Sequence, residues 1–120
     1  MNILIVDDNP RMRGAIKSLL TAPGVECIEC ENGIQALQKY KEMEPAWVLM
    51  DIMMPGINGF EATRRIVTEN PDARVVIVTD YGDNEFKDAA EKAGAVAFIL
   101  KEDLVKLREL CLNNKSKESI

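Results

Sequence analysis

The segment WVLMDIMMPGING, residues 47–59, has the pattern of a short buried strand that ends on an acid. Four apolar residues predict a strand at 47–50, and Asp51 follows them directly, ahead of a loop rich in proline and glycine. A carboxylate at the end of a buried strand costs free energy unless a positive group lies beside it. The rest of the chain is therefore expected to supply a positive partner for Asp51.

Apolar runs alternate with helical patterns along the whole chain. The run NILIV, at 2–6, is typical of a strand buried on both faces, and Asn9 predicts the cap of a helix after it. Gly94 predicts the end of a helix at 83–93, and Asp103 is expected to cap the last helix. Strands are expected at 2–6, 25–29, 47–50, 74–79 and 96–100, and the helices begin near Pro10, Gly33, Gly59, Asp83 and Asp103.

Five strands that alternate with five helices predict an α/β fold, with a doubly wound parallel sheet and helices on both of its faces. No linker, internal repeat or low-complexity segment interrupts the pattern. Residues 1–120 are therefore expected to form a single domain. The polar end NNKSKESI, residues 113–120, is expected to fray.

The composition is that of an ordinary globular domain, with 47% hydrophobic and 29% charged residues among 120. The formal charge of −5 argues against direct binding of nucleic acid. The apolar runs are shorter than the ~18 residues that a membrane span needs, and the acidic start does not resemble a signal peptide. We therefore expect a cytoplasmic domain with no membrane segment. The sequence has no histidine, which excludes a Ser-His-Asp triad and a histidine-ligated metal on this chain.

Cys27 and Cys30 form a C-x-x-C pair in and beside the strand expected at 25–29. Positions i and i+3 of a strand point to opposite faces, whereas a redox C-x-x-C normally opens a helix. No second pair of cysteines or histidines completes a metal site. A structural role in the sheet is therefore the better interpretation of these two thiols.

The functional candidates lie where the strands end, because a doubly wound sheet carries its site at the carboxyl ends of its strands. The first strand ends in Asp7 and Asp8, the third in Asp51, the fourth in Thr79 and the fifth in Lys101. If the first and third strands are neighbours, three carboxylates converge. Mg²⁺, which prefers oxygen ligands, would relieve their mutual repulsion. Lys101 would add a second positive charge, and Thr79 a hydroxyl.

This combination suits a phosphoryl group, because a metal ion and an ammonium group can balance the charge on its oxygens. The chain lacks a glycine-rich phosphate loop, so a nucleotide is not the expected ligand. A carboxylate can itself accept the phosphoryl group as an acyl phosphate. Asp51 is the best candidate because it stands alone at its strand end, while Asp7 and Asp8 would hold the metal.

Four segments together resemble the receiver domain of response regulators in two-component signalling. They are LIVDDNP with Asp7 and Asp8, LMDIMMPGINGFE with Asp51, VVIVTD with Thr79, and AFILK with Lys101. The resemblance extends over residues 2–112, and the segments occur in the order and at the spacing of receiver domains. It implies a flavodoxin-like sheet with the strand order 2-1-3-4-5.

The resemblance implies that Mg²⁺ is bound by Asp8, Asp51 and the backbone carbonyl of Met53, with Asp7 near the ion through a water. It implies that Asp51 accepts a phosphoryl group from a phosphohistidine on a sensor histidine kinase or a phosphotransfer protein. The domain would then be a phosphoacceptor and not an enzyme, and would at most assist its own phosphorylation and dephosphorylation.

The resemblance also implies a conformational switch. Thr79 would turn toward the phosphoryl group and Phe98 would turn inward, which changes the face formed by the helix at 83–93, the strand at 96–100 and the last helix. Physically, this is a shift between two existing packings that new contacts to the phosphoryl oxygens favour. An output domain, a partner protein or a second copy of the chain would read this face.

The sequence departs from the family pattern at two positions near the site. Glu102 follows Lys101 where the family commonly has a proline after a cis bond. A cis bond without proline costs about 3–4 kcal/mol, so we expect a trans bond here. Asp80 stands where the family usually has a small residue. It is either a solvated loop residue or an acid that slows phosphorylation by repulsion.

Two other functions remain open on the sequence. A hydrolase that works through an aspartyl phosphate would carry a D-x-D motif, and DIM at 51–53 lacks the second acid. A pseudo-receiver would bind partners without being phosphorylated. Asp80 and Glu102 favour this alternative weakly, whereas the presence of both Thr79 and Lys101 beside the acids argues against it.

Overall fold

The computed structural model describes residues 1–113, so the fraying expected at 113–120 concerns residues that, except for Asn113, lie outside the described part. The strands are β1 (Asn2–Val6), β2 (Glu26–Cys30), β3 (Trp47–Met50), β4 (Val75–Thr79) and β5 (Ala97–Leu100). The helices are α1 (Pro10–Leu19), α2 (Gly33–Met43), α3 (Gly59–Glu69), α4 (Asn84–Ala93) and α5 (Val105–Leu112), with a short 3-10 helix, η1 (Lys101–Asp103), before α5. Within residues 1–113, no helix has both the length and the apolar character needed to cross a membrane.

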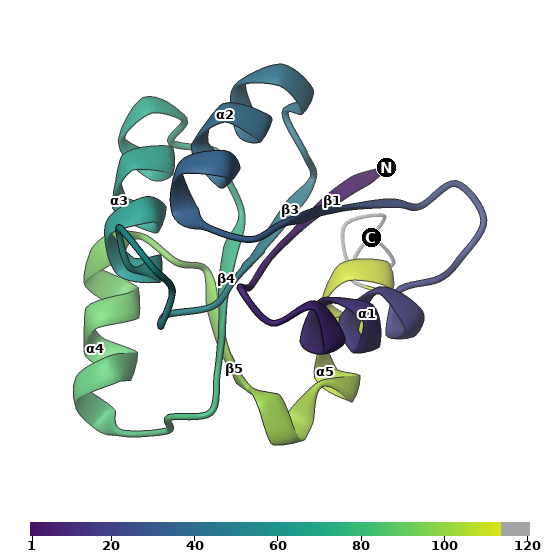
Figure 1. Ribbon diagram of the computed structural model, residues 1–120. Coiled ribbons are helices and arrows are strands. Elements are labelled where there is room, and N and C mark those ends of the chain that lie inside the picture. The colour runs from purple at the N-terminus through teal and green to yellow at the C-terminus, as the bar shows by residue number, and fades with distance from the viewer. Residues whose placement is uncertain (114–120) are drawn as a thin grey trace, which may run out of the picture.

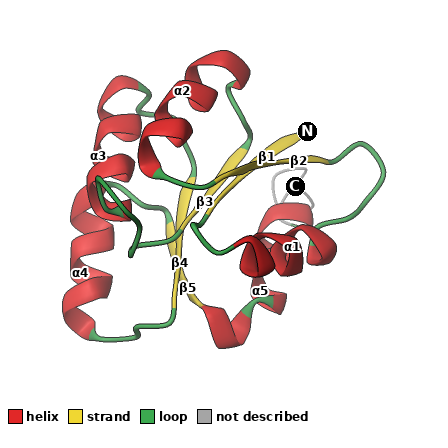
Figure 2. Cartoon of the chain, viewed as in Figure 1, coloured by secondary structure: helices red, strands yellow, loops and turns green. Residues whose placement is uncertain are grey.

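The five strands form one sheet in which every neighbouring pair is parallel. Their order is β2-β1-β3-β4-β5, and the crossover from β2 to β3 places β1 and β3 side by side (Figure 1). This order and the alternation of strands with helices (Figure 2) confirm the predicted doubly wound, flavodoxin-like fold. The carboxyl ends of β1 and β3 therefore meet at the switch point of the sheet.

Two clusters of buried apolar side chains cover the two faces of the sheet. One cluster contains Ala36 of α2, Ile66 of α3 and Ala90 of α4. The other contains Ile16 of α1 and Leu107 of α5. Helices α2, α3 and α4 thus lie on one face and α1 and α5 on the other, as Figure 1 shows. Every residue of β3 and β4 is buried, which explains why the sequence of these strands is almost entirely apolar.

Asparagine side chains fix the starts of three helices. Asn9, Asn32 and Asn58 each have an extended backbone, and each side chain accepts a hydrogen bond from a backbone N–H in the first turn of α1, α2 or α3. Gly94 ends α4 in the left-handed conformation, with φ of 99°, as its position in the sequence predicts. Local signals therefore account for these four helix boundaries.

The prediction that Asp103 caps the last helix is wrong. Asp103 is the last residue of η1, and Leu104 occupies the cap position of α5 with helical backbone angles (φ −57°, ψ −26°). A capping side chain needs an extended backbone at its own residue, and the 3-10 turn removes it. The Asp103 carboxylate lies 3.7 Å from the Lys106 ammonium instead. The bond between Lys101 and Glu102 is trans, as expected.

The cysteines are structural, as their positions in the sequence indicate. Cys27 packs on the face covered by α1 and α5, and Cys30 on the opposite face. Cys111 of α5 is also buried, and all three thiols are free. Burial raises the pKa of Cys30 to about 11 and that of Cys111 to about 12. Because the thiolate is the reactive form, these raised pKa values disfavour reactions of the two thiols at neutral pH.

Thr63 of α3 is fully buried, and its hydroxyl has no hydrogen-bond partner among the described residues. We expect Thr63→Val to raise the free energy of unfolding by about 1 kcal/mol, because valine has the same shape and carries no unpaired polar group. Thr68→Val is the matched control, since Thr68 is exposed on the same helix. Urea denaturation checks the prediction, which fails if the two variants change stability equally.

Candidate functional site

The acids of the candidate site are held together by the pairing of β1 with its two neighbours. Val6 and Met50 are partners in the parallel ladder, so Asp7 and Asp51 follow at adjacent positions. The Asp51 N–H donates to the carbonyl of Val6 at 2.9 Å, and the Asp7 N–H donates to that of Cys30 at 3.1 Å. One carboxylate oxygen each from Asp7, Asp8 and Asp51 lies within 4.8 Å of the other two.

Lys101 is the positive partner that the sequence predicts for Asp51. Its ammonium nitrogen lies 3.3 Å from Oδ1 of Asp51 and 3.1 Å from Oδ2 of Asp7. Lys101 follows β5, so its side chain reaches across the end of β4 to meet the carboxylates. The lysine side chain is 12% exposed, which leaves little water to weaken these ion pairs.

The electrostatics of the site follow from burial. Asp7 is 2% exposed and Asp51 is 6% exposed, whereas Asp8 is exposed. Burial raises the pKa of Asp51 from 3.8 to about 6, negative Asp7 adds to the shift, and Lys101 opposes it only in part. Burial alone would lower the pKa of Lys101, but the Asp51 and Asp7 carboxylates together raise it. The site therefore has more negative charge than Lys101 balances.

The residues at this site fit a magnesium ion. Three carboxylates with oxygens within 4.8 Å of one another form an all-oxygen donor set, and exposed Asp8 leaves a path to solvent. Both oxygens of Asp7 have partners, because Oδ1 accepts from the Asn9 N–H at 2.8 Å and Oδ2 pairs with Lys101. This suits the indirect, water-mediated role expected of Asp7. Met53 lies in the loop after β3, and the role of its carbonyl stays a prediction.

Thr79 and Phe98, the expected switch residues, lie on β4 and β5. Thr79 is 1% exposed, and its hydroxyl accepts a hydrogen bond from the Tyr81 N–H at 3.2 Å. Phe98 is half-buried and packs against the core under α2, α3 and α4. Thr79 is the register partner of Leu100, which places it one residue from Lys101. Asp80 is exposed, as its interpretation as a solvated loop residue requires. The switching roles stay predictions.

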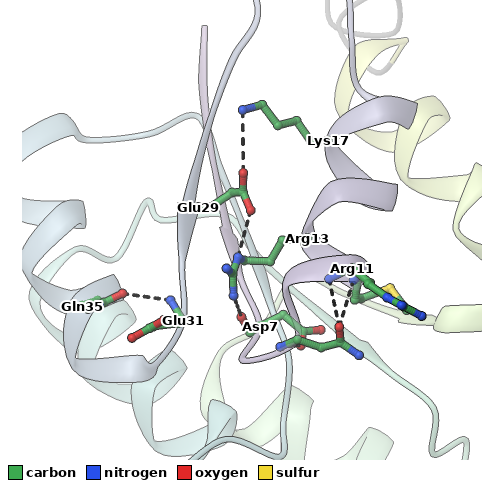
Figure 3. A network of polar contacts seen from close by, with 9 residues as sticks. Asp7, Arg11, Arg13, Lys17, Glu29, Glu31 and Gln35 are labelled. Carbon is green, nitrogen blue, oxygen red and sulfur yellow. Dashed lines mark hydrogen bonds and ion pairs between the residues drawn. The ribbon is translucent and has the colours of Figure 1, made fainter.

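Two residues that matter for the site were not predicted from the sequence. Arg13 of α1 donates from Nη1 to the backbone carbonyl of Asp7 at 2.7 Å, a contact that joins a helix to a strand end (Figure 3). Gly59, the first residue of α3, lies against the backbone of Asp51 and Ile52, where a Cβ would overlap the Asp51 carbonyl oxygen. The repeated glycines in PGING signal a special backbone, but the sequence does not say which glycine is needed.

A family model of the response regulator receiver domain matches residues 3–111. The chain belongs to the receiver-domain family of response regulators. This receiver domain is 41% identical over 100 residues to the chemotaxis protein CheY of Thermotoga maritima, with 82% of this chain and 83% of CheY covered. It is 43% identical over 100 residues to CheY of Bacillus subtilis, at the same coverage.

Other relatives are longer than this receiver domain. It is 37% identical over 103 residues to the response regulator GacA of Pseudomonas protegens, where the match covers 84% of this chain and 48% of GacA. The chain therefore spans about half the length of the GacA proteins that it matches. Among solved structures, CheY in the CheX-CheY-BeF3-Mg²⁺ complex of Borrelia burgdorferi has a TM-score of 0.86 and 27% identity, covering 96% of this chain and 89% of that one.

Proposed function

We propose that this receiver domain is the phosphoacceptor of a two-component system, with Asp51 as the acceptor. The observation that carries the proposal is the convergence of Asp7, Asp8, Asp51 and Lys101 at the switch point of the sheet. The donor would be a phosphohistidine on a sensor histidine kinase or a phosphotransfer protein, since the chain itself has no histidine. The B. burgdorferi relative supports this assignment, because BeF3 resembles a phosphoryl group in shape and charge.

The proposed transfer makes one bond and breaks one bond. A carboxylate oxygen of Asp51 attacks phosphorus, and the P–N bond to the donor imidazole breaks, with the electron pair and a proton from water going to nitrogen. Lys101, 3.3 Å from Oδ1, would neutralise charge on the phosphoryl oxygens. Mg²⁺, held by Asp8, Asp51 and the Met53 carbonyl with Asp7 behind a water, would neutralise the same oxygens when bound.

The output of the domain is proposed on the same basis. Thr79 would leave Tyr81 for the phosphoryl group and Phe98 would turn inward, so that the face formed by α4, β5 and α5 changes. An output domain, a partner protein or a second copy of the chain would read that face. The domain would act in the cytoplasm as a phosphoacceptor and not as an enzyme on other substrates.

The test is phosphorylation by a small donor. We expect incubation with Mg²⁺ and acetyl phosphate to add one phosphoryl group to the chain, measured by intact-mass spectrometry, and we expect Asp51→Asn to abolish it. Asp80→Asn is the matched control, because Asp80 is an exposed acid beside the site and its loss leaves the acceptor intact. Absence of any adduct would favour a pseudo-receiver, and turnover of many donor molecules would favour a hydrolase.

A further inference from the structure

A set of polar contacts adjoins the acidic site at Asp7, and Arg13 is at the centre of this set (Figure 3). Its Nη1 donates to the backbone carbonyl of Asp7 at 2.7 Å, and its Nε donates to Oε1 of Glu29 at 2.9 Å. The other oxygen of Glu29 lies 3.7 Å from the ammonium of Lys17. Arg13 therefore joins α1 to the end of β1 and to β2, although these segments are separate in the sequence.

The carbonyl that Arg13 contacts belongs to the peptide group between Asp7 and Asp8. Asp7 is the first residue after β1, where the chain leaves the sheet, so a side chain supplies the partner for this carbonyl. A guanidinium is a strong, planar donor with a fixed direction. Glu29 fixes the guanidinium in turn, and the Arg13 side chain is only 14% exposed. The carbonyl of this peptide group therefore has a fixed donor in Arg13.

We propose that Arg13 is a positioning residue for the metal site. By holding the peptide group between Asp7 and Asp8, it keeps these two carboxylates close to Asp51, as a divalent cation requires. Residues that orient metal ligands in this way typically change metal affinity about 10–100-fold when they are replaced. This inference rests on the proposed function, since it concerns the same Mg²⁺ site.

The direction in which Mg²⁺ affinity changes on removal of Arg13 distinguishes a positioning role from a simple effect of its charge. Arg13 is a cation close to a site for another cation, so its charge alone opposes Mg²⁺ binding. If charge were its only influence, removing Arg13 would tighten Mg²⁺ binding. If Arg13 positions the carboxylates, removing it weakens binding in spite of the lost repulsion.

The experiment is isothermal titration of the full chain with Mg²⁺ at a temperature where each variant is folded. We expect Arg13→Met to raise the Mg²⁺ Kd about tenfold. Lys17→Met is the matched control, because it removes the same charge from the same helix and from the same partner, Glu29. The Lys17 side chain is 52% exposed and its charge is screened. We therefore expect the Mg²⁺ Kd of Lys17→Met to stay within about twofold of the wild-type value.

A second variant keeps the test decisive if Arg13→Met does not fold. Arg13→Lys keeps the charge, but a single ammonium cannot replace both donors of the fork, so we expect weaker binding here too. An unchanged or tighter Kd in the folded Arg13 variant overturns the positioning role alone, as does equal weakening by Lys17→Met. A wild-type chain that binds no Mg²⁺ overturns the inference together with the metal step of the proposed function.

Discussion

Gly59→Ala is expected to destabilise the chain by about 3 kcal/mol, as a steric overlap in a closely packed interior does. A Cβ at residue 59 would overlap the Asp51 carbonyl oxygen and lie 2.8 Å from its carbonyl carbon and 2.9 Å from Cα of Ile52. These are backbone atoms, so no rotamer change relieves the overlap. Relief requires movement of Asp51 itself, and we therefore expect slower uptake of phosphate from acetyl phosphate as well.

Gly14→Ala is the control for this change. Gly14 lies within α1, where a Cβ would meet nothing within 4 Å. Alanine favours a helix over glycine, so this variant is expected to gain about 0.5–1 kcal/mol. Urea denaturation of both variants measures the difference. Equal stabilities for the two variants would show that α3 can shift away from Asp51 at little cost.

Asp51→Asn is expected to stabilise the metal-free chain at neutral pH by up to about 3 kcal/mol, the free energy that corresponds to a pKa shift of about two units. Burial raises the pKa of Asp51 from 3.8 to about 6, so the folded state favours the protonated form. The resulting stability is present below about pH 4, falls as pH rises toward 6, and is absent above it. Asparagine is uncharged throughout and avoids this loss.

The measurement is urea denaturation of the wild type and Asp51→Asn in EDTA at pH 4.5 and pH 7.5. We expect the advantage of the variant to be several-fold larger at pH 7.5. Asp80→Asn, which removes an exposed acid in the same way, is the matched control. An advantage for Asp51→Asn that stays constant with pH would mean that the Asp51 carboxylate is not destabilised by its surroundings.

The fold was predictable because its signals are local. The strand at 47–50 has the boundaries expected of it, because Asp51 and the proline- and glycine-rich loop mark its end, and the next helix begins at Gly59 as expected. The start of the last helix was not predicted correctly, because the acid that suggests a cap lies in a 3-10 turn. Whether a 3-10 turn precedes the helix depends on the direction in which the chain leaves β5. No short sequence motif predicts that direction.

The site was predictable to the extent that strand ends carry its residues. The rule for parallel sheets places Asp7, Asp51 and Lys101 at the same edge, and the strand order that the resemblance implies makes the first and third strands neighbours. The contact of Arg13 with Asp7 and the fit of Gly59 against Asp51 could not, because each depends on the distance between two elements. The raised pKa of Asp51 likewise depends on burial, which exists only in the assembled fold.

The position of Lys101 determines how late in folding the acidic site becomes complete. Asp7 and Lys101 stand at opposite ends of the sequence, and four of the five strands, β1, β3, β4 and β5, must be in register before the amine reaches the acids. Such long-range contacts form late, after most of the chain-closure entropy has been lost. A nascent or partly unfolded chain therefore lacks the complete site, and a phosphoryl donor of the proposed kind would find that site only on molecules that have completed folding.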